Sequence, residues 1–440
     1  MLQNENIICV SYSTWEGPYT KSVVQLMSLL GQNNRVLYVE YPFTVKDLVY
    51  TLLGKQQAPV ARMLGLKPRA IVKKTAEGAE VLNWVLPPMI PVNAIKNEKL
   101  YRILLNIDTW IYRRSLRRAI KKFNMGNPVV VNAYNPIFGE QLLGKLNEKA
   151  SIYYCYDGFS KDRRGIRAWD ADRCFSETAD GIIVTSDFLK EQKLQANRNV
   201  IAVKNGVDFA MFNREAKKEP APAGIRRKIG YIGSIDQRFD LETVEFAVKD
   251  LPGYDFEFIG DVRNPGVKSR LEQYPNVTFL PPVKPAEVPE RLKQCDAGII
   301  PYICNEINKN VYPLKINEYL ATGVPVVLTK FAKLPEFNGQ VHFAATAEEF
   351  RDAIVAATEN DSKEKIKSRI GFASSNSWIS RAEEFSAAIV DFCSKKRSNP
   401  TLNGNHEPNP KSIIFWTKVR DVLVINNPGF KAGVRQIAKN

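Results

Sequence analysis

The chain has 440 residues, of which 44% are hydrophobic and 25% are charged, and its formal net charge is +15. This length is enough for two hydrophobic cores, and no apolar run approaches the ~20 residues that a membrane-spanning helix requires. Because His342 and His406 are the only histidines, a histidine-rich metal site is excluded.

The cysteines and the N-terminal residues indicate in which cellular compartment the protein is expected. The six cysteines are scattered without a Cys-x-x-Cys pair, and the polar N-terminus shows no signal peptide. These features predict a cytoplasmic protein in a reducing environment. The positive charge favours an anionic partner such as a nucleotide, a phospholipid surface or a lipid-linked phosphate. No nucleic-acid-binding motif is recognisable, so a nucleic-acid partner is not expected.

The first half of the chain alternates short β-rich runs with helical stretches, which is typical of an α/β fold with a doubly wound parallel sheet. Its clearest helices are expected at 21–30 and 101–123. The alternation predicts strands at 7–10, 36–39, 81–86, 128–132, 151–156, 181–185 and 200–203.

A second series of the same kind follows a linker. Residues 219–224 read Glu-Pro-Ala-Pro-Ala-Gly, a composition that buries little and suits a connection. Strands are expected at 228–232, 255–259, 277–279, 297–301, 326–328 and 341–344, with helices at 241–249, 286–294, 313–322 and 347–357. The predicted parts are a Rossmann-like domain over 1–213, a linker over 214–227, a second Rossmann-like domain over 228–395 and a basic extension over 396–440.

The most informative segment spans residues 311–328. Pro313 suits the first turn of a helix and Gly323 its end, and a short buried strand follows Pro325. Lys315 and Glu318 are three residues apart, so they share a helix face near its positive end. The helix start and the lysine can hold phosphates while the carboxylate accepts hydrogen bonds from ribose hydroxyls. The alternative is an ordinary solvated Lys-Glu pair.

Residues 318–327, Glu-Tyr-Leu-Ala-Thr-Gly-Val-Pro-Val-Val, resemble the nucleotide-sugar site of GT-B glycosyltransferases, most closely the retaining family 4, or glycosyl transferases group 1. The resemblance implies two Rossmann-like domains that face each other across a cleft. It implies that Glu318 binds the donor ribose and that Lys315 and Leu314 lie at the donor. The family often has a second Glu eight positions before Glu318, where this chain has Asn310, and Pro313 replaces a tight glycine.

Two further stretches resemble the same family. They are Asn-Gly-Val-Asp at 205–208 and Val-Thr-Ser-Asp-Phe-Leu-Lys at 184–190. Asn-Gly is a turn signal by itself. We interpret both stretches as architectural, with no part in the chemistry.

Gly233, Arg238 and Gly260 follow the first two strands of the second series. Glycine lets the backbone approach a ligand or simply turn. The resemblance implies that Arg238 faces the donor diphosphate, where a cation offsets the charge that grows on the leaving nucleotide. It implies that Gly260 lets the nucleotide base approach. The alternative for Arg238 is a surface arginine.

Two loops of the first half are expected to reach the cleft. Asp157 follows a strand, so it can contact sugar or acceptor hydroxyls or merely cap a turn. In the loop after the first strand only Gly17 matches the glycine-rich loop of the family. Beside it, Trp15 and Glu16 are candidate sugar contacts, since an indole ring stacks on apolar sugar faces.

Six cations recur on one face of the helix expected at 101–123: Arg113, Arg114, Arg117, Arg118, Lys121 and Lys122. A solvated face is the ordinary explanation of such a run. Because no acid interrupts it, docking on an anionic membrane surface is the preferred interpretation. The apolar-basic stretch at 413–425 is expected to add to this attachment.

The resemblance predicts a glycosyltransferase that moves a sugar from a nucleotide-sugar donor, expected to be a UDP-sugar, to a saccharide or lipid-linked acceptor in cell-surface polysaccharide biosynthesis. It implies retention of configuration and no metal or other cofactor. The predicted location is the cytoplasm, at the inner face of the cell membrane. Two alternatives stay open: a GT-B nucleotide-sugar epimerase, and a non-catalytic membrane-associated homologue.

Overall fold

A computed structural model describes residues 2–17, 21–159, 165–222 and 224–398, and Met1–Cys393 form one compact unit. The predicted apolar-basic stretch at 413–425 lies outside the described residues. Among those described, no helix combines the length and the apolar character needed to cross a membrane.

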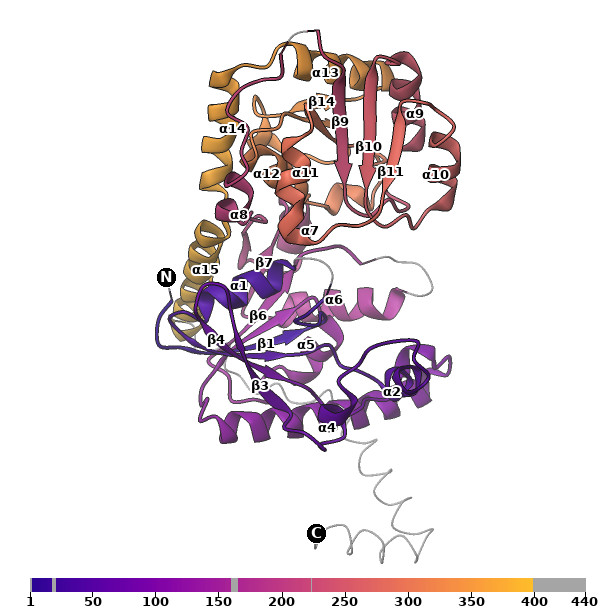
Figure 1. Cartoon of the computed structure of the whole chain (residues 1–440). Coiled ribbons are helices and arrows are strands. Elements are labelled where there is room, and N and C mark those ends of the chain that lie inside the picture. Colours follow the sequence, from indigo (N-terminus) through magenta and orange to yellow (C-terminus); the bar gives the residue numbers. More distant parts are fainter. Residues whose placement is uncertain (1, 18–20, 160–164, 223, 399–440) are drawn as a thin grey trace, which may run out of the picture. The chain divides into compact units, whose positions relative to one another are not determined.

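The first part of the chain builds an eight-stranded sheet in the order β3-β4-β2-β1-β5-β6-β7-β8 (Figure 1). All neighbouring pairs are parallel except β3 with β4, which are antiparallel. The strands are β1 (Asn6–Ser11), β2 (Arg35–Val39), β3 (Ala70–Lys74), β4 (Glu80–Trp84), β5 (Val129–Ala133), β6 (Ala150–Cys155), β7 (Gly181–Val184) and β8 (Val200–Ala202).

Helices cover both faces of this sheet, as the alternation predicted. The core on one face includes α4 residues Tyr112 and Leu116, and the core on the other includes α1 residues Leu26 and Leu30. The helices of this part are α1 (Ser22–Leu30), α2 (Val45–Leu52), α3 (Val60–Met63), α4 (Glu98–Lys122), α5 (Pro136–Leu142), α6 (Ile166–Thr178), α7 (Asp187–Leu194) and α8 (Phe209–Asn213), with a 3-10 turn at Val92–Ala94.

The second part builds a six-stranded, wholly parallel sheet in the order β11-β10-β9-β12-β13-β14. Its strands are β9 (Arg227–Ile232), β10 (Tyr254–Ile259), β11 (Val277–Leu280), β12 (Ala297–Ile300), β13 (Val326–Thr329) and β14 (His342–Ala344). The order reverses between β9 and β12, which is where ligands bind in open α/β sheets. The predicted fold class, two Rossmann-like doubly wound sheets, is confirmed.

The helices of the second part are α9 (Leu241–Asp250), α10 (Pro265–Leu271), α11 (Val288–Lys293), α12 (Leu314–Ala321), α13 (Ala347–Glu359), α14 (Lys363–Ser375) and α15 (Trp378–Ser398), with 3-10 turns at Pro285–Glu287, Asn308–Asn310 and Pro335–Phe337. The last of them, α15, returns to the first sheet. Its Phe385, Ile389 and Phe392 share a core with Ile152 of β6 and Ile183 of β7. The division of the chain near residue 214 follows the two sheets and stays a prediction.

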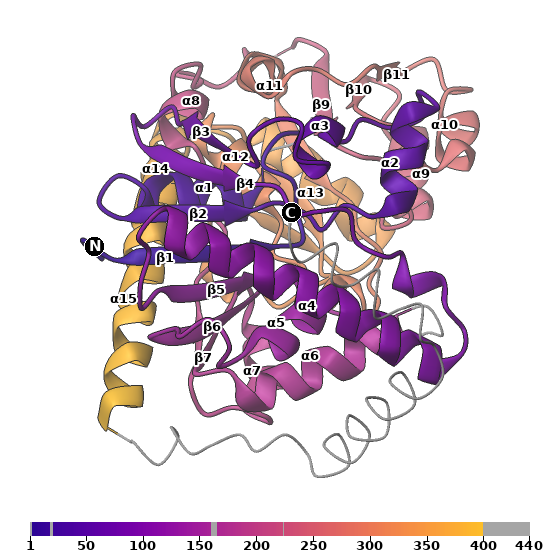
Figure 2. The same ribbon diagram turned by 90° about the horizontal axis from the view of Figure 1, so that it is seen from below.

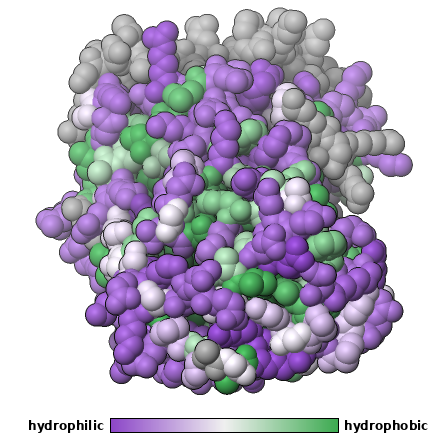
Figure 3. Space-filling model, turned by 90° about the horizontal axis from the view of Figure 1, so that it is seen from above, coloured by the Kyte–Doolittle hydropathy of each residue, from purple (hydrophilic) through white to green (hydrophobic). Residues whose placement is uncertain are grey.

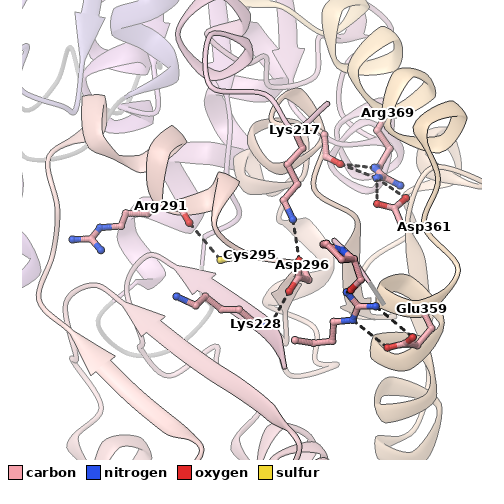
Figure 4. Close-up of polar contacts among 11 residues, drawn as sticks. Lys217, Lys228, Arg291, Cys295, Asp296, Glu359, Asp361 and Arg369 are labelled. Atoms are coloured by element: carbon pink, nitrogen blue, oxygen red, sulfur yellow. Dashed lines mark hydrogen bonds and ion pairs between the residues drawn. The ribbon is translucent and has the colours of Figure 1, made fainter. Parts of the chain in front are cut away.

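A polar network anchors the linker and the C-terminal end of α12 (Figure 4). Lys217 Nζ lies 3.1 Å from Asp296 Oδ1, and Asp296 Oδ2 accepts a hydrogen bond from the Lys228 N–H at 2.9 Å. Arg369 donates to the carbonyl of Gly323, which ends α12, and to Asp361. These contacts anchor the C-terminal end of α12, the helix that carries Lys315 and Glu318. Because a helix is rigid, they also help to position its N-terminal end.

Candidate functional site

A cavity of about 480 Å³ opens at the carboxyl ends of β9, β10 and β12, beside the N-terminal end of α12. This is the point at which the strand order of the second sheet reverses. The cavity gathers six of the predicted site residues: Gly233, Arg238, Gly260, Leu314, Lys315 and Glu318.

Two glycines form the floor of the cavity where β9 and β10 end. Gly233 has φ +147° and Gly260 has φ +149°, conformations that other residues rarely adopt. A Cβ on Gly260 would collide with the carbonyl of Gly233, and a Cβ on Gly233 would collide with the side chain of Lys315. Glycine is therefore required at position 260 by the nearby backbone and by its φ, and at position 233 by its φ, and neither residue places a side chain between the backbone and the cavity.

Lys315 enters the cavity from the first turn of α12. Its Nζ donates to Tyr302 Oη at 3.1 Å and lies 4.9 Å from the ring centroid of Tyr231. Burial opposes the charge of Lys315, but the two phenols more than offset it, so the pKa of Lys315 is raised. Burial alone would raise the pKa of Tyr302, but Lys315 and Arg238 lower it. The cavity is therefore strongly electropositive at this end.

Glu318 lies one turn further along α12 and lines the same cavity. Burial raises the pKa of its carboxyl to about 7, and Lys315 opposes the rise. Within the described part of the chain, the Glu318 carboxylate forms no hydrogen bond and no ion pair with another residue. A half-buried carboxylate in this state is free to accept hydrogen bonds from a ligand.

Arg238 approaches from the loop after β9. Its guanidinium is held bidentately by Asp236, at 3.0 Å from Oδ1 and 2.7 Å from Oδ2. The same group lies 5.3 Å from the ring centroid of Tyr302. Asp236 raises the pKa of Arg238, so the cation is permanent. Arg238 is thus an ordered residue of the cavity wall, unlike an unattached surface arginine.

The sequence analysis missed three residues that line or shape the cavity. Tyr302 follows the carboxyl end of β12, and the strand-end rule used for Gly233 could have identified it. Tyr231 lies within β9 and packs under Lys315. Asn205, interpreted as architectural, lines the cavity and donates to the carbonyl of Tyr312 at 3.0 Å. Its turn motif indicated a bend but not a position at the site.

Asp157 and Asn310 do not line this cavity but lie near one another. The Asn310 amide is 3.1 Å from where a Cβ on Gly158 would stand, and Gly158 donates to Asp157 Oδ1 at 2.8 Å. Asn310 Nδ2 donates to the carbonyl of Glu306 at 2.9 Å, while its buried Oδ1 has no partner among the described residues. Burial raises the pKa of Asp157, and the positive charge of Arg238 opposes the rise. Asp157 is therefore within electrostatic range of a residue that lines the cavity.

The loop after β1 also lies outside the cavity lining. Trp15 packs edge-on against Tyr38, with 5.0 Å between ring centroids, and its backbone N–H donates to Glu40 Oε2. Glu16 is exposed and forms an ion pair with Lys73. Gly17 has φ +154°, and the loop is held by Lys21, whose Nζ donates to the carbonyls of residues 14 and 16.

Comparisons with known proteins agree with this geometry. Residues 226–360 match the family model described as Glycosyl transferases group 1. A stretch of 163 residues is 34% identical to TuaH of Bacillus subtilis (strain 168), which carries a provisional assignment as a teichuronic acid biosynthesis glycosyltransferase. That match covers 35% of this chain and 41% of TuaH, so the chain spans under half the length of this curated relative.

Solved structures support the fold over most of the chain. A sucrose-phosphate synthase from Thermosynechococcus elongatus superposes with a TM-score of 0.64 at 14% identity, over 89% of this chain and 100% of that one. A glycosyltransferase from Rickettsia africae gives a TM-score of 0.61 at 12% identity, over 89% and 99% of the two chains. The predicted resemblance to GT-B glycosyltransferases of group 1 is therefore confirmed.

Proposed function

We propose that this chain is a glycosyltransferase that moves a sugar from a nucleotide-sugar donor to a saccharide or lipid-linked acceptor, with retention of configuration. We expect a UDP-sugar as donor and cell-surface polysaccharide biosynthesis in the cytoplasm as the setting. The provisional role of TuaH in teichuronic acid biosynthesis supports a polysaccharide acceptor. The match over 226–360, the part that carries the cavity, supports the donor class.

The observation that carries the proposal is that one cavity contains a carboxylate without a partner among the described residues, Glu318, and two cations held in place, Lys315 and Arg238. Glu318 accepts two hydrogen bonds from the ribose hydroxyls in its ionised form. Lys315 and Arg238 face the diphosphate, where Tyr302 and Asp236 hold them. The bare backbone at Gly233 and Gly260 lets the nucleotide come close. A ligand with a hydroxylated ring and a diphosphate matches all three features.

The same residues can assist the chemical step. When the bond between the sugar carbon and the diphosphate breaks, negative charge grows on the leaving phosphate. Lys315, Arg238 and the positive end of α12 stabilise that charge in a partly enclosed site, where fixed cations act strongly. This arrangement can replace a metal ion. We assign Leu314 to the apolar wall against the donor, since it lines the cavity.

The residues outside the cavity lining are proposed to serve the sugar and the acceptor. Asp157 and Asn310, which adjoin through Gly158, are assigned to the transferred sugar. Trp15, Glu16 and Gly17 are assigned to the acceptor side, where the indole ring and the carboxylate can contact a saccharide. Asp157 and the residues 15–17 follow carboxyl ends of strands of the first sheet, where open α/β sheets bind ligands, and Asn310 adjoins Asp157 from the 3-10 turn before α12.

The test is nucleotide binding followed by turnover. Calorimetry with UDP, GDP and dTDP should show binding to the wild type, with Glu318→Gln strongly weakened. The matched control is Glu272→Gln, which changes an exposed carboxylate just after α10 and outside the cavity. Slow release of nucleotide from a nucleotide sugar would support transfer. Binding without any turnover would favour the non-catalytic homologue, and conversion of the donor sugar into its epimer would favour the epimerase.

A further inference from the structure

One face of α4 is unlike the rest of the surface, and it lies apart from the nucleotide cavity. The residues at 100, 103, 107, 110, 114, 117, 118 and 121 fall within an arc of about 100° on a helix with 3.6 residues per turn. The buried residues of α4, such as Tyr101, Tyr112 and Leu116, lie on the opposite side. We name this arc the outer face of α4. Figure 2 shows α4 in front of the strands of the first sheet.

The N-terminal half of the outer face is apolar and exposed. Leu100, Ile103, Ile107 and Trp110 have 45%, 42%, 43% and 53% of their surface exposed. Such a row at i, i+3, i+7 and i+10 normally packs into a core. The other side of this helix already supplies its core, and the row belongs to no hydrophobic core in the described part of the chain. The face of the molecule in Figure 3, by contrast, is mostly hydrophilic, with hydrophobic residues in small patches.

The C-terminal half of the outer face is basic. Arg114, Arg117, Arg118 and Lys121 of this face, together with Trp110 and with Arg113 at its border, surround a depression of about 370 Å³. Among the described residues these five cations form no ion pair, whereas Arg102 on the same helix is paired with Glu98. Arg114 stacks over Trp110 at 5.5 Å, so the two halves meet.

The helix α4 itself places no carboxylate on this face. The acids of α4 are Glu98, which pairs with Arg102 and Arg167, and Asp108, which is buried and accepts from the Ile90 N–H. The like charges also disturb one another: burial lowers the pKa of Arg69, and Arg118 lowers it further. Charge alone would suit a surface that only maintains solubility, but such a surface has no need for an adjoining exposed apolar row.

We propose that the outer face of α4 docks on an anionic lipid bilayer, with the apolar row seated among the acyl chains and the arginines holding lipid phosphates. The apolar row spans about 15 Å along the helix, at 1.5 Å per residue, and the basic half continues along the same line. An apolar row argues against a nucleic acid as the occupant, because a phosphodiester backbone offers it nothing to bury. Lipid phosphates complement the cations and the acyl region complements the leucine and isoleucines.

This docking goes beyond glycosyl transfer and does not depend on it. It would bring the protein to a surface that holds lipid-linked molecules, whatever the nucleotide cavity does. Nucleotide binding can therefore be measured in the same variants, and a failure of one proposal leaves the other standing.

The first experiment is sedimentation of the full chain with vesicles of phosphatidylcholine, with and without phosphatidylglycerol. Binding should require the anionic lipid and fall with salt. Each cation near such a surface contributes about a fivefold change in partition, so replacing Arg113, Arg114, Arg117 and Arg118 with Gln should weaken binding at least ~100-fold. The matched control replaces four exposed lysines of the second part with Gln and should bind nearly as the wild type: Lys330, Lys363, Lys365 and Lys367.

The second experiment tests the apolar half. Ile103→Ser combined with Ile107→Ser should weaken vesicle binding about tenfold or more, because each substitution removes an apolar side chain that docking would bury in the bilayer. Brominated acyl chains should quench tryptophan fluorescence in the wild type, and the quenching should be clearly smaller in Trp110→Phe, which keeps the apolar surface. Nucleotide binding should be unchanged in both variants.

Three results would overturn the docking. One is a wild-type protein that stays in the supernatant with strongly anionic vesicles at low salt. Another is binding that survives the four arginine substitutions, or that falls equally in the lysine control. The third is binding to soluble heparin as tight as to vesicles, with no effect of the isoleucine substitutions, which would make the basic half a site for a soluble polyanion.

Discussion

Replacing Glu318 with Gln should make the protein more stable and worse at binding nucleotide at the same time. Burial raises the pKa of Glu318 from 4.5 to about 7, so ionisation of this carboxylate lowers the free energy of unfolding of the ligand-free protein. One pKa unit corresponds to about 1.4 kcal/mol, so the cost above pH 7 is at most about 3.5 kcal/mol. The ionised form is nevertheless the one that accepts the two ribose hydroxyls.

The sign of the stability effect follows from the raised pKa. Between pH 4.5 and about 7 the folded state binds more protons at Glu318 than the unfolded state, so this contribution to stability falls as the pH rises. Glutamine does not titrate. The thermal midpoint of Glu318→Gln should therefore match that of the wild type below pH 4.5 and exceed it above pH 7, and Glu272→Gln should show no such difference.

Nucleotide affinity should change in the opposite direction. In the wild type, UDP should bind about 30-fold more weakly at pH 5.5 than at pH 8, because only the ionised fraction of Glu318 binds. The terminal phosphate of UDP itself titrates near pH 6, so the two proteins must be compared. At pH 8 the variant should lose about 2–4 kcal/mol of binding free energy, and its remaining pH dependence should be that of the phosphate alone.

Calorimetry across this pH range, with thermal unfolding of the same samples, tests both the predicted gain in stability and the predicted loss of nucleotide affinity. A variant that is less stable than the wild type at pH 8 would mean that the Glu318 carboxylate has a structural partner. The same pH dependence of UDP binding in both proteins would mean that Glu318 does not contact the nucleotide. Either result would refute the reasoning from the unpartnered carboxylate.

Three other predictions follow from contacts in and near the site. Lys315→Ala and Arg238→Ala should each lower kcat more than they lower the thermal midpoint, because their interaction with the phosphate strengthens as the nucleotide leaves; a nucleotide complex with either cation more than ~6 Å from phosphate would reject this, since that distance exceeds a charge-assisted hydrogen bond. Gly260→Ala should cost at least ~2 kcal/mol of stability, because its Cβ meets the carbonyl of Gly233 at a positive φ; an unchanged thermal midpoint would contradict it. Asp108→Asn should raise the thermal midpoint at pH 8 and leave it unchanged below pH 3.8, because burial raises the pKa of Asp108 to about 6; an equal shift at both pH values would point to another cause.

Local sequence determined the elements that carry the nucleotide cavity. Pro313 and Gly323 bound a helix that the structure places at Leu314–Ala321, and the strand ends predicted at 232 and 259 are those of β9 and β10. These features depend on backbone preferences and short-range spacing, which are legible in a single chain. Parallel strand ends meet at one edge, so Gly233, Gly260, Lys315 and Glu318 could be expected together.

Long-range packing decided what the sequence could not. The last helix, α15, returns to the first sheet because its apolar side chains are buried there against strands that are distant in the chain. The phenol of Tyr302 became a partner of Lys315 in the same way.

The outer face of α4 shows this division most clearly. The spacing of its cations could be read directly from the sequence, but Leu100, Ile103, Ile107 and Trp110 have the spacing of a core stripe. The N-terminal half of α4 is apolar on more than one side, so periodicity alone does not say which side is buried. Only the packing of Tyr101, Leu105 and Tyr112 against the sheet turned the other row toward solvent.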